Sequence, residues 1–148
     1  MTGARLYLAG PGAEVERVIA HAAELEALGH VFTMAWWERV TEERSRGWMT
    51  DADVPADYMR ENAIMNREGL DRADAVIALA RLRGGMSPGC AGEVAYAVAL
   101  HWAERIDLAR NKIILVGDPL GFVWSFDPAV TVVPTMADAI ALLPHRGW

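Results

Sequence analysis

The sequence predicts an α/β fold in which a doubly wound, five-stranded parallel sheet lies between two layers of helices, a three-layer α/β/α sandwich of flavodoxin-like or Rossmann-like type. Short apolar runs of strand length alternate along the chain with longer segments whose apolar residues recur at helical spacing. Turns containing glycine and proline separate many of these segments. Such alternation is typical of parallel strands joined by right-handed crossovers. The 148 residues are expected to form one domain, because no internal repeat or linker divides them.

The first two predicted strands lie near the N-terminus. The run Arg5–Ala9 is short and apolar, and Gly10-Pro11-Gly12 ends it in a tight turn. Ala13–Leu28 follows as a helix, because its apolar residues lie three and four apart and Gly29 occupies the position after its last turn. Val31–Ala35 is then expected as the second strand.

The middle of the chain has a less regular pattern. Residues Trp36–Asp53 are charged, rich in tryptophan and without clear periodicity. We expect them to form a flexible cover over a binding site, helical in part at Glu38–Arg46. Pro55–Arg72 is predicted to be a helix, since proline is well accepted in a first helical turn. The apolar run Ala75–Ala80 is the third predicted strand.

The last part of the chain completes the alternation. A loop rich in glycine leads into a helix predicted from about Gly89 to Glu104. Lys112–Val116 is the fourth strand and Val130–Val133 the fifth, and both are apolar and β-branched. Met136–Leu143 is predicted to be a short final helix.

One carboxylate stands at the predicted carboxyl edge of the sheet. Glu93 is expected in the first turn of the helix after the third strand, and ligands of α/β sheets bind at this edge. The helix dipole favours a charged carboxylate there, and Gly89 and Gly92 let a ligand approach the backbone. The loops predicted to surround this crevice are Tyr7–Gly12, Ser87–Glu93 and Gly117–Trp124. The alternative is that Glu93 only compensates the helix dipole.

Composition narrows the class of partner to a small molecule. The formal net charge of −6 argues against binding to nucleic acid polymers or to anionic membranes. We find neither an apolar run long enough to span a membrane nor a signal peptide, so a cytoplasmic protein is expected. The single cysteine, Cys90, fits a reducing compartment and is expected to be a small buried residue rather than a nucleophile. The histidines are scattered, with no carboxylate or cysteine at the spacing of metal ligands, so no metal is expected. We expect no other cofactor either.

Three segments, in this order, resemble the nucleoside 2-deoxyribosyltransferase superfamily. They are Tyr7-Leu8-Ala9-Gly10-Pro11, Ala73-Asp74-Ala75-Val76-Ile77-Ala78 and Gly92-Glu93-Val94-Ala95-Tyr96-Ala97. The resemblance covers most of the chain up to about Val116. It implies an enzyme that cleaves the N-glycosidic bond of a nucleoside or nucleotide, on a nucleoside deoxyribosyltransferase-like domain that forms a homodimer or a larger homo-oligomer.

The resemblance also implies roles for Glu93 and Tyr7. In the superfamily the glutamate matching Glu93 attacks the anomeric carbon and forms a glycosyl-enzyme ester, while the residue matching Tyr7 orients it through a hydrogen bond. A carboxylate is suited to this, because it can capture an oxocarbenium-like carbon and later be displaced. The acceptor is another base in the transferases and water in the hydrolases. Alternatively, Tyr7 only packs in its strand.

Ser87 indicates a nucleoside 5′-monophosphate as the substrate. Transferases of free nucleosides tend to carry an aspartate six residues before the glutamate, whereas this serine resembles the nucleoside 5′-monophosphate N-hydrolase branch. A hydroxyl and backbone amides hold phosphate without adding a like charge. Hydrolysis is therefore favoured over base transfer. A serine before proline also has an ordinary conformational explanation, and Arg81 and Arg83 are either phosphate ligands or solvated loop residues.

Asn66 departs from the family pattern. An aspartate that helps protonate or bind the departing base is usual eight residues before Asp74. Asparagine can hydrogen-bond a base but cannot supply a proton. Either the proton comes from elsewhere, with Asp71, Glu68 and His101 as candidates, or the base differs. The third possibility is a non-catalytic nucleotide-binding or sensing module.

Tryptophans supply the candidates for stacking on a base. Trp36, Trp37 and Trp48 lie in the predicted cover, and Trp124 is placed to close the crevice or a subunit interface. Together with the residues of the loops around the crevice, the residues expected to bind substrate are Gly10, Pro11, Ser87, Gly89, Gly92, Trp36 and Trp124.

Overall fold

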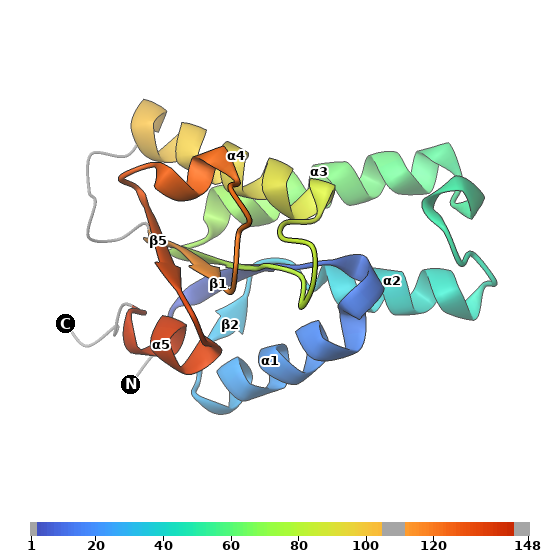
Figure 1. Ribbon diagram of the computed structural model, residues 1–148. Helices are drawn as coiled ribbons and strands as arrows, with labels where there is room; N and C mark the ends of the chain where they lie inside the picture. The colour runs from blue at the N-terminus through green and yellow to red at the C-terminus, as the bar shows by residue number, and fades with distance from the viewer. Residues whose placement is uncertain (1–2, 105–111, 144–148) are drawn as a thin grey trace.

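The computed structural model describes residues 3–104 and 112–143, and Figure 1 traces the path of the chain. The strands are β1 (Arg5–Ala9), β2 (Val31–Phe32), β3 (Ala75–Leu79), β4 (Lys112–Val116) and β5 (Val130–Val133). The helices are α1 (Val15–Ala27), α2 (Trp36–Ser45), α3 (Ala56–Arg72), α4 (Pro88–Glu104) and α5 (Met136–Ala141). Short 3-10 turns are η1 (Gly12–Glu14), η2 (Asp51–Asp53) and η3 (Val123–Phe126).

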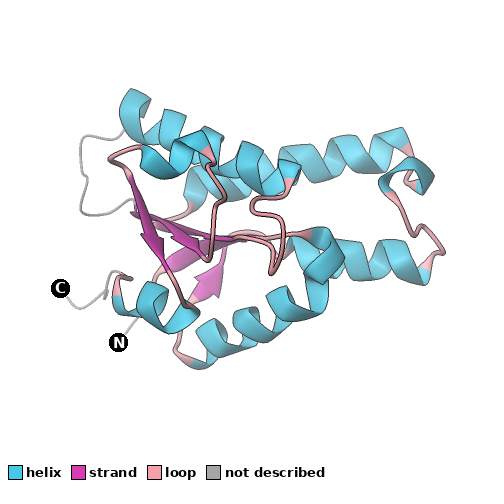
Figure 2. Ribbon diagram, in the orientation of Figure 1, coloured by secondary structure: helices cyan, strands magenta, loops and turns pink. Residues whose placement is uncertain are grey.

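The five strands form one parallel sheet in the order β2-β1-β3-β4-β5, which confirms the flavodoxin-like arrangement. Helices α1 and α5 cover one face of the sheet and α3 and α4 cover the other, so the molecule has the three predicted layers (Figures 1 and 2). The chain crosses in opposite directions after β1 and after β3, which are neighbours at the centre. Doubly wound sheets bind ligands at the carboxyl ends of two neighbouring strands whose following connections run in opposite directions.

Burial on both faces explains why the strands read as continuous apolar runs. All five residues of β3 are buried, and Leu8 of β1 is paired in register with Ile77 of β3. Gly10 lets α1 pack closely, because a Cβ there would lie 2.8 Å from a methyl carbon of Val18. No helix within the described residues is long and apolar enough to cross a membrane.

The segment after β1 and α1 differs from its prediction. The second strand has two residues instead of five, and helix α2 begins directly at Trp36. Trp36 is buried and donates a hydrogen bond from Nε1 to the carbonyl oxygen of Leu8, at 2.6 Å. Trp37 is buried too, with its ring 4.9 Å from that of Phe32 in an edge-to-face contact. The helical part predicted at Glu38–Arg46 is therefore confirmed, but it begins two residues earlier and is held by two tryptophans in the core.

Helices α2 and α3 continue past the carboxyl edge of the sheet. Figure 1 shows the two helices side by side beyond the strands, with η2 in the connection between them. Arg39 of α2 fixes the pair through Nε, which donates to Oδ1 of Asn62 at 2.6 Å, and through an ion pair with Glu61 at 2.7 Å. This extension adds a wall to the crevice at the end of the sheet.

Candidate functional site

A cavity of about 580 Å³ opens at the carboxyl edge of the sheet. Its walls come from the turn after β1, the facing sides of α2 and α3, the connection between those helices, and the start of α4. The cavity is within the size range of small-molecule sites. Among the described residues, the charged side chains that line it are Glu43, Arg44, Asp51 and Glu93.

Tyr7 and Glu93 meet at this cavity. The phenol of Tyr7 donates a hydrogen bond to Oε1 of Glu93, with 2.8 Å between the oxygens. Tyr7 is fully buried on β1 and Glu93 lies on α4, so the contact joins two segments 86 residues apart in the chain. The structure thus brings together the two residues that the resemblance assigns to one reaction.

Glu93 does not occupy the first turn of its helix, as the sequence analysis expected. Helix α4 begins at Pro88, which makes Glu93 its sixth residue, and its first turn contains no acidic side chain. The dipole effect decays within the first turn. Compensation of the dipole therefore gives a poor account of this carboxylate.

Burial dominates the electrostatics of Glu93. Loss of solvent raises the pKa of its carboxyl from 4.5 to about 7, although the hydrogen bond from Tyr7 favours the charged form and acts in the opposite direction. Burial and the neighbouring carboxylate both raise the pKa of Tyr7, so its phenol keeps its proton and remains a donor. A carboxyl group that titrates near neutrality in a cleft is typical of a functional site.

Close packing of α3 holds the ring of Tyr7 in place. Gly69 lies against this ring, and a Cβ at position 69 would stand 3.1 Å from a ring carbon and 2.7 Å from Cβ of Met34. The missing side chain therefore lets α3 approach the end of β1. The ring is left with its hydroxyl directed to Glu93.

Asn66 lies on the same face of α3 as Gly69, where that face borders the cavity. Asn62, Asn66 and Gly69 are three and four residues apart, the spacing of neighbours on one side of a helix. Both asparagines line the cavity. Oδ1 of Asn66 is buried and accepts no hydrogen bond from the described residues.

The acids named as substitutes for Asn66 lie elsewhere. Asp71 is exposed and accepts a hydrogen bond from the phenol of Tyr96 at 2.7 Å. Glu68 is exposed on α3, and His101 is buried in the last turns of α4 beside Trp102. None of these three candidates lines the cavity.

Ser87 and Gly89 do line the cavity, at the start of α4. Oγ of Ser87 accepts a hydrogen bond from the amide of Cys90 at 3.4 Å, so the side chain caps the helix. The hydroxyl proton of Ser87 has no acceptor among the described residues and is available to a ligand. A Cβ at Gly89 would meet no atom within 4 Å, which leaves the backbone open to the cavity.

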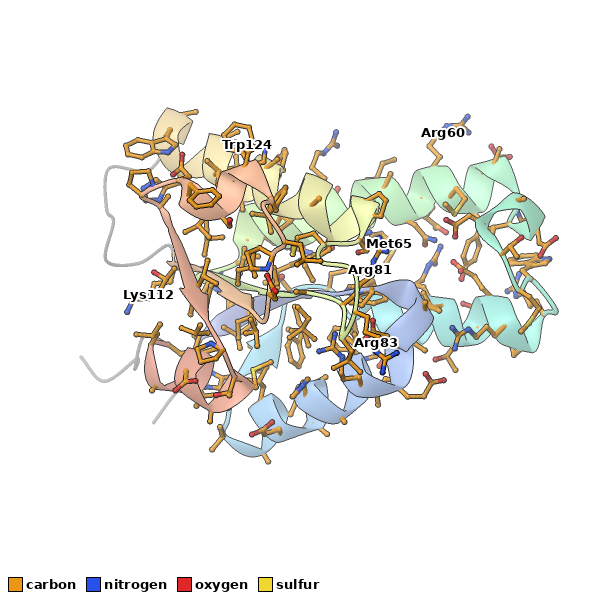
Figure 3. All side chains as sticks on the ribbon, viewed as in Figure 1. Arg60, Met65, Arg81, Arg83, Lys112 and Trp124 are labelled. Atoms are coloured by element: carbon orange, nitrogen blue, oxygen red, sulfur yellow. The ribbon has the colours of Figure 1, made fainter. Side chains whose placement is uncertain are left out.

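The other predicted ligand residues are divided. Gly10 and Trp36 line the cavity, although the indole N–H of Trp36 is used by the core hydrogen bond described above. Pro11 is fully buried, and Gly92 is exposed away from the cavity wall. Trp124 lies on η3 beside α4, is 41% exposed, and does not reach the cavity (Figure 3).

The loop after β4 therefore does not share the cavity, in contrast to the predicted three-loop crevice. Pro119 and Leu120 pack against Gly85 in the loop after β3 instead. Arg81 supports that loop, since its guanidinium donates to the carbonyl oxygen of Met86 at 3.2 Å. Arg83 is exposed on the same loop (Figure 3). Neither arginine lines the cavity.

Cys90 and Asp74, two residues named in the sequence analysis, have structural roles. Cys90 is buried, and burial together with nearby Glu93 raises the pKa of its thiol, which keeps it protonated and unreactive. Asp74 lies at the opposite edge of the sheet, where it accepts hydrogen bonds from the backbone amide of Arg5 at 2.8 Å and from the guanidinium at 2.9 Å. It fixes the start of β3 against β1.

The sequence analysis placed Trp36–Asp53 at the site but missed the charged residues of α2 that line it. Glu43 and Arg44 line the cavity, and Arg44 also donates to the carbonyl oxygen of Gly12 at 3.2 Å and so ties α2 to the turn after β1. Trp48 lines it as well, with its ring 5.4 Å from that of Tyr58. Helix α2 has no apolar stripe that would have shown which of its charged residues face inward.

The described residues include no group of three or more histidine, cysteine or acidic side chains arranged to hold a metal ion. Comparisons of the chain with protein-family models, with curated proteins and with solved structures gave no match. The resemblance of the three motifs therefore stays a prediction, and the functional argument depends on the geometry of the cavity.

Proposed function

We propose that this protein cleaves the N-glycosidic bond of a nucleoside 5′-monophosphate or nucleoside through Glu93, in the manner of the nucleoside 2-deoxyribosyltransferase superfamily. The observation that carries the proposal is the hydrogen bond of 2.8 Å from Tyr7 to a partly buried carboxylate at the wall of a ligand-sized cavity. A glycosidase nucleophile needs one carboxylate oxygen held in place while the other attacks. A tyrosine donor on a rigid central strand meets that need.

In the first step the ionised carboxylate of Glu93 forms a bond to the anomeric carbon. The bond from that carbon to the base nitrogen breaks, and its electron pair leaves with the base. In the second step water attacks the same carbon and the carboxylate of Glu93 departs as the leaving group. The water proton passes to the base or to solvent, so hydrolysis restores the enzyme.

Tyr7 is the positioning residue in both steps. Its hydrogen bond stabilises the carboxylate form and fixes the direction of the attacking oxygen. Because the phenol keeps its proton, it can stay bonded to Glu93 in the free enzyme and hold the ester oxygen in the intermediate. Asn66 stands where the superfamily has an aspartate that assists the departing base. Its amide acts here by hydrogen bonding to the base and not by protonating it.

The start of α4 is the proposed place for the 5′-phosphate. Ser87 contributes a free hydroxyl proton, and the open backbone at Gly89 lets a phosphate approach the helix N-terminus. Arg44 lines the same cavity from α2, where its guanidinium also forms an ion pair with Glu16 at 3.2 Å. The other three charged side chains of the cavity are acidic and would repel a phosphate.

The test is a chromatographic screen for free base with purified protein and a panel of ribo- and deoxyribonucleosides and their 5′-monophosphates. We expect base release by the wild type and a loss of at least about 1,000-fold in Glu93→Gln, because the amide is a poor nucleophile of nearly the same shape. Glu38→Gln, an equal charge change at an exposed site on α2, is the matched control and should retain activity. Adding a second base separates transfer from hydrolysis.

Asn66 gives one specific reason to keep a second candidate, a nucleotide-binding or sensing module without catalysis. The cavity contains an amide where the related enzymes have an acid, and none of the three alternative acids reaches it. Ligand binding with no base release from any substrate, equal in wild type and Glu93→Gln, supports this candidate and refutes the enzyme.

A further inference from the structure

Glu43 is a buried carboxylate on the cavity wall, in addition to the partly buried Glu93. Only 8% of the residue is exposed, yet it lines the cavity together with Asn62 and Asn66. No lysine, arginine or histidine among the described residues forms an ion pair with it. Burial of a carboxylate without a cation is costly and needs another source of hydrogen bonds.

A relay of two hydrogen bonds fixes the orientation of Glu43. Nε of Arg39 donates to Oδ1 of Asn62 at 2.6 Å, and Nδ2 of Asn62 donates to Oε1 of Glu43 at 2.9 Å. A guanidinium can only donate, so the amide oxygen of Asn62 must face Arg39 and its NH₂ group must face Glu43. Arg39 is itself held over the ring of Tyr58 and by Glu61.

This relay leaves hydrogen-bond acceptors directed to the ligand. One oxygen of Glu43 accepts a single hydrogen bond from Asn62 and keeps a second lone pair, and the other oxygen has no donor among the described residues. The carboxylate can therefore still accept two hydrogen bonds from a ligand. Oδ1 of Asn66, one helical turn nearer to Tyr7, is buried and also lacks a donor there. The carboxylate of Glu43 therefore selects a ligand that presents donors.

The geometry of α3 gives the direction of the ligand. Gly69 touches the ring of Tyr7, so the reacting sugar carbon lies at that end of the helix. Asn62 is seven residues earlier, about 10 Å along the axis. A base attached to the reacting carbon would extend along this face toward Glu43.

We propose that Glu43 determines base specificity and selects guanine; this inference rests on the proposed function, which places a nucleoside or nucleotide in the cavity. Guanine presents two adjacent donors, the ring N1–H and the exocyclic amino group, to a carboxylate. Adenine, cytosine and uracil each set a donor beside an acceptor, and that acceptor would face the negative oxygens of Glu43. Sites built around such hydrogen bonds reject analogues that lack the donor.

The test compares guanosine, inosine, adenosine and uridine and their 5′-monophosphates by calorimetric binding to the Glu93→Gln protein, in which cleavage is blocked. Inosine differs from guanosine only by the missing amino group. We expect guanosine or its monophosphate to bind about 10- to 100-fold more tightly than the inosine counterpart, the range for one hydrogen bond to a charged group. The order should be the same with and without the phosphate.

Substitution at Glu43 should remove this preference. In Glu43→Gln the amide oxygen is held by Asn62, so the NH₂ group turns to the ligand and replaces an acceptor with a donor. The guanosine-to-inosine ratio should fall to near one, while Glu38→Gln on the same helix should leave it unchanged. Asn62→Ala is a second variant, which frees the carboxylate without removing it and should lower the ratio several-fold. Thermal unfolding checks that each variant is folded.

The outcomes separate this inference from the proposed function. Equal binding of guanosine and inosine by the parent protein, no binding of any compound, or a ratio that survives both variants would overturn the role of Glu43. Selective binding of guanine without base release by the wild type would support Glu43 and refute the enzyme. Base release that depends on Glu93 but not on Glu43 would refute only the specificity.

Discussion

Glu93→Gln should make the protein more stable at alkaline pH and remove a pH dependence that the wild type shows. The carboxyl of Glu93 has an ordinary pKa of 4.5 and a folded-state pKa of about 7, because burial disfavours its charge. The folded protein therefore binds a proton more tightly than the unfolded chain. The contribution of the Glu93 carboxyl to the free energy of unfolding is fully present below pH 4.5 and is lost as the pH rises to about 7. Above that pH the contribution no longer changes.

The size of the effect follows from the pKa shift. At about 1.4 kcal/mol for each pKa unit, the shift corresponds to about 3 kcal/mol of unfolding free energy between pH 4.5 and pH 8.5. This is a large share of the stability of a small domain, about 5–15 kcal/mol. The glutamine variant keeps the size of the side chain and its oxygen for Tyr7 but has no charge to desolvate. The difference between the two proteins should therefore grow with pH in favour of the variant.

The assay is urea unfolding followed by circular dichroism, for wild type and variant, at half-unit steps over this pH range. Other titrating groups affect both proteins and cancel in the difference. The control is Glu38→Gln, which removes an exposed charge from α2 and should change stability by less than about 0.5 kcal/mol throughout. A constant difference between wild type and Glu93→Gln would refute the reasoning, because it would mean that the Glu93 carboxylate is as well solvated in the folded protein as in the unfolded chain.

Two other substitutions test the neighbours of this group and the opposite edge of the sheet. Tyr7→Phe removes the hydrogen bond that stabilises the charged form of Glu93, so the pKa of the Glu93 carboxyl should rise above about 7. Base release at neutral pH should then fall about 10-fold or more, and the acidic limb of the pH–rate profile should move to higher pH. An unchanged profile would show that Tyr7 does not act through Glu93. Asp74→Asn weakens an ion pair whose arginine side chain is half exposed, so urea unfolding should show a loss below about 1 kcal/mol, with base release unaffected. A loss of activity without a loss of stability would give Asp74 a functional role that its position does not suggest.

The fold was predictable from the sequence because its three central strands, β1, β3 and β4, are buried on both faces. A run such as Lys112–Val116 has no competing interpretation at that length, and its predicted bounds agree with β4. The segment after Phe32 was not predictable in the same way. Trp36 and Trp37 start a helix there because each finds a partner on or near the sheet, and such tertiary contacts leave no periodic signal in the sequence.

The site was only partly predictable, for a related reason. Tyr7 lies on a strand two residues before its end and Glu93 lies in the second turn of the helix that follows another strand, and parallel topology brings such segments to one edge of the sheet. Glu43 belongs to a helix that has charged residues on all sides. Its inward direction depends on Asn62 and Arg39, which lie on the two different helices of the extension. A pattern within one helix cannot contain that information.

The position of Glu93 itself argues for a chemical role over a structural one. It lies in the second turn of α4, where the helix dipole contributes little, and its carboxylate forms no ion pair with the described residues. Keeping it charged above neutral pH costs about 3 kcal/mol even with the hydrogen bond from Tyr7 in place. Glutamine would keep that hydrogen bond, and leucine or methionine would fill the space, without the cost of desolvating a charge. A carboxylate at this point therefore weakens the fold, and what it supplies in return is a partly desolvated nucleophile that ionises near pH 7 at the wall of a cavity.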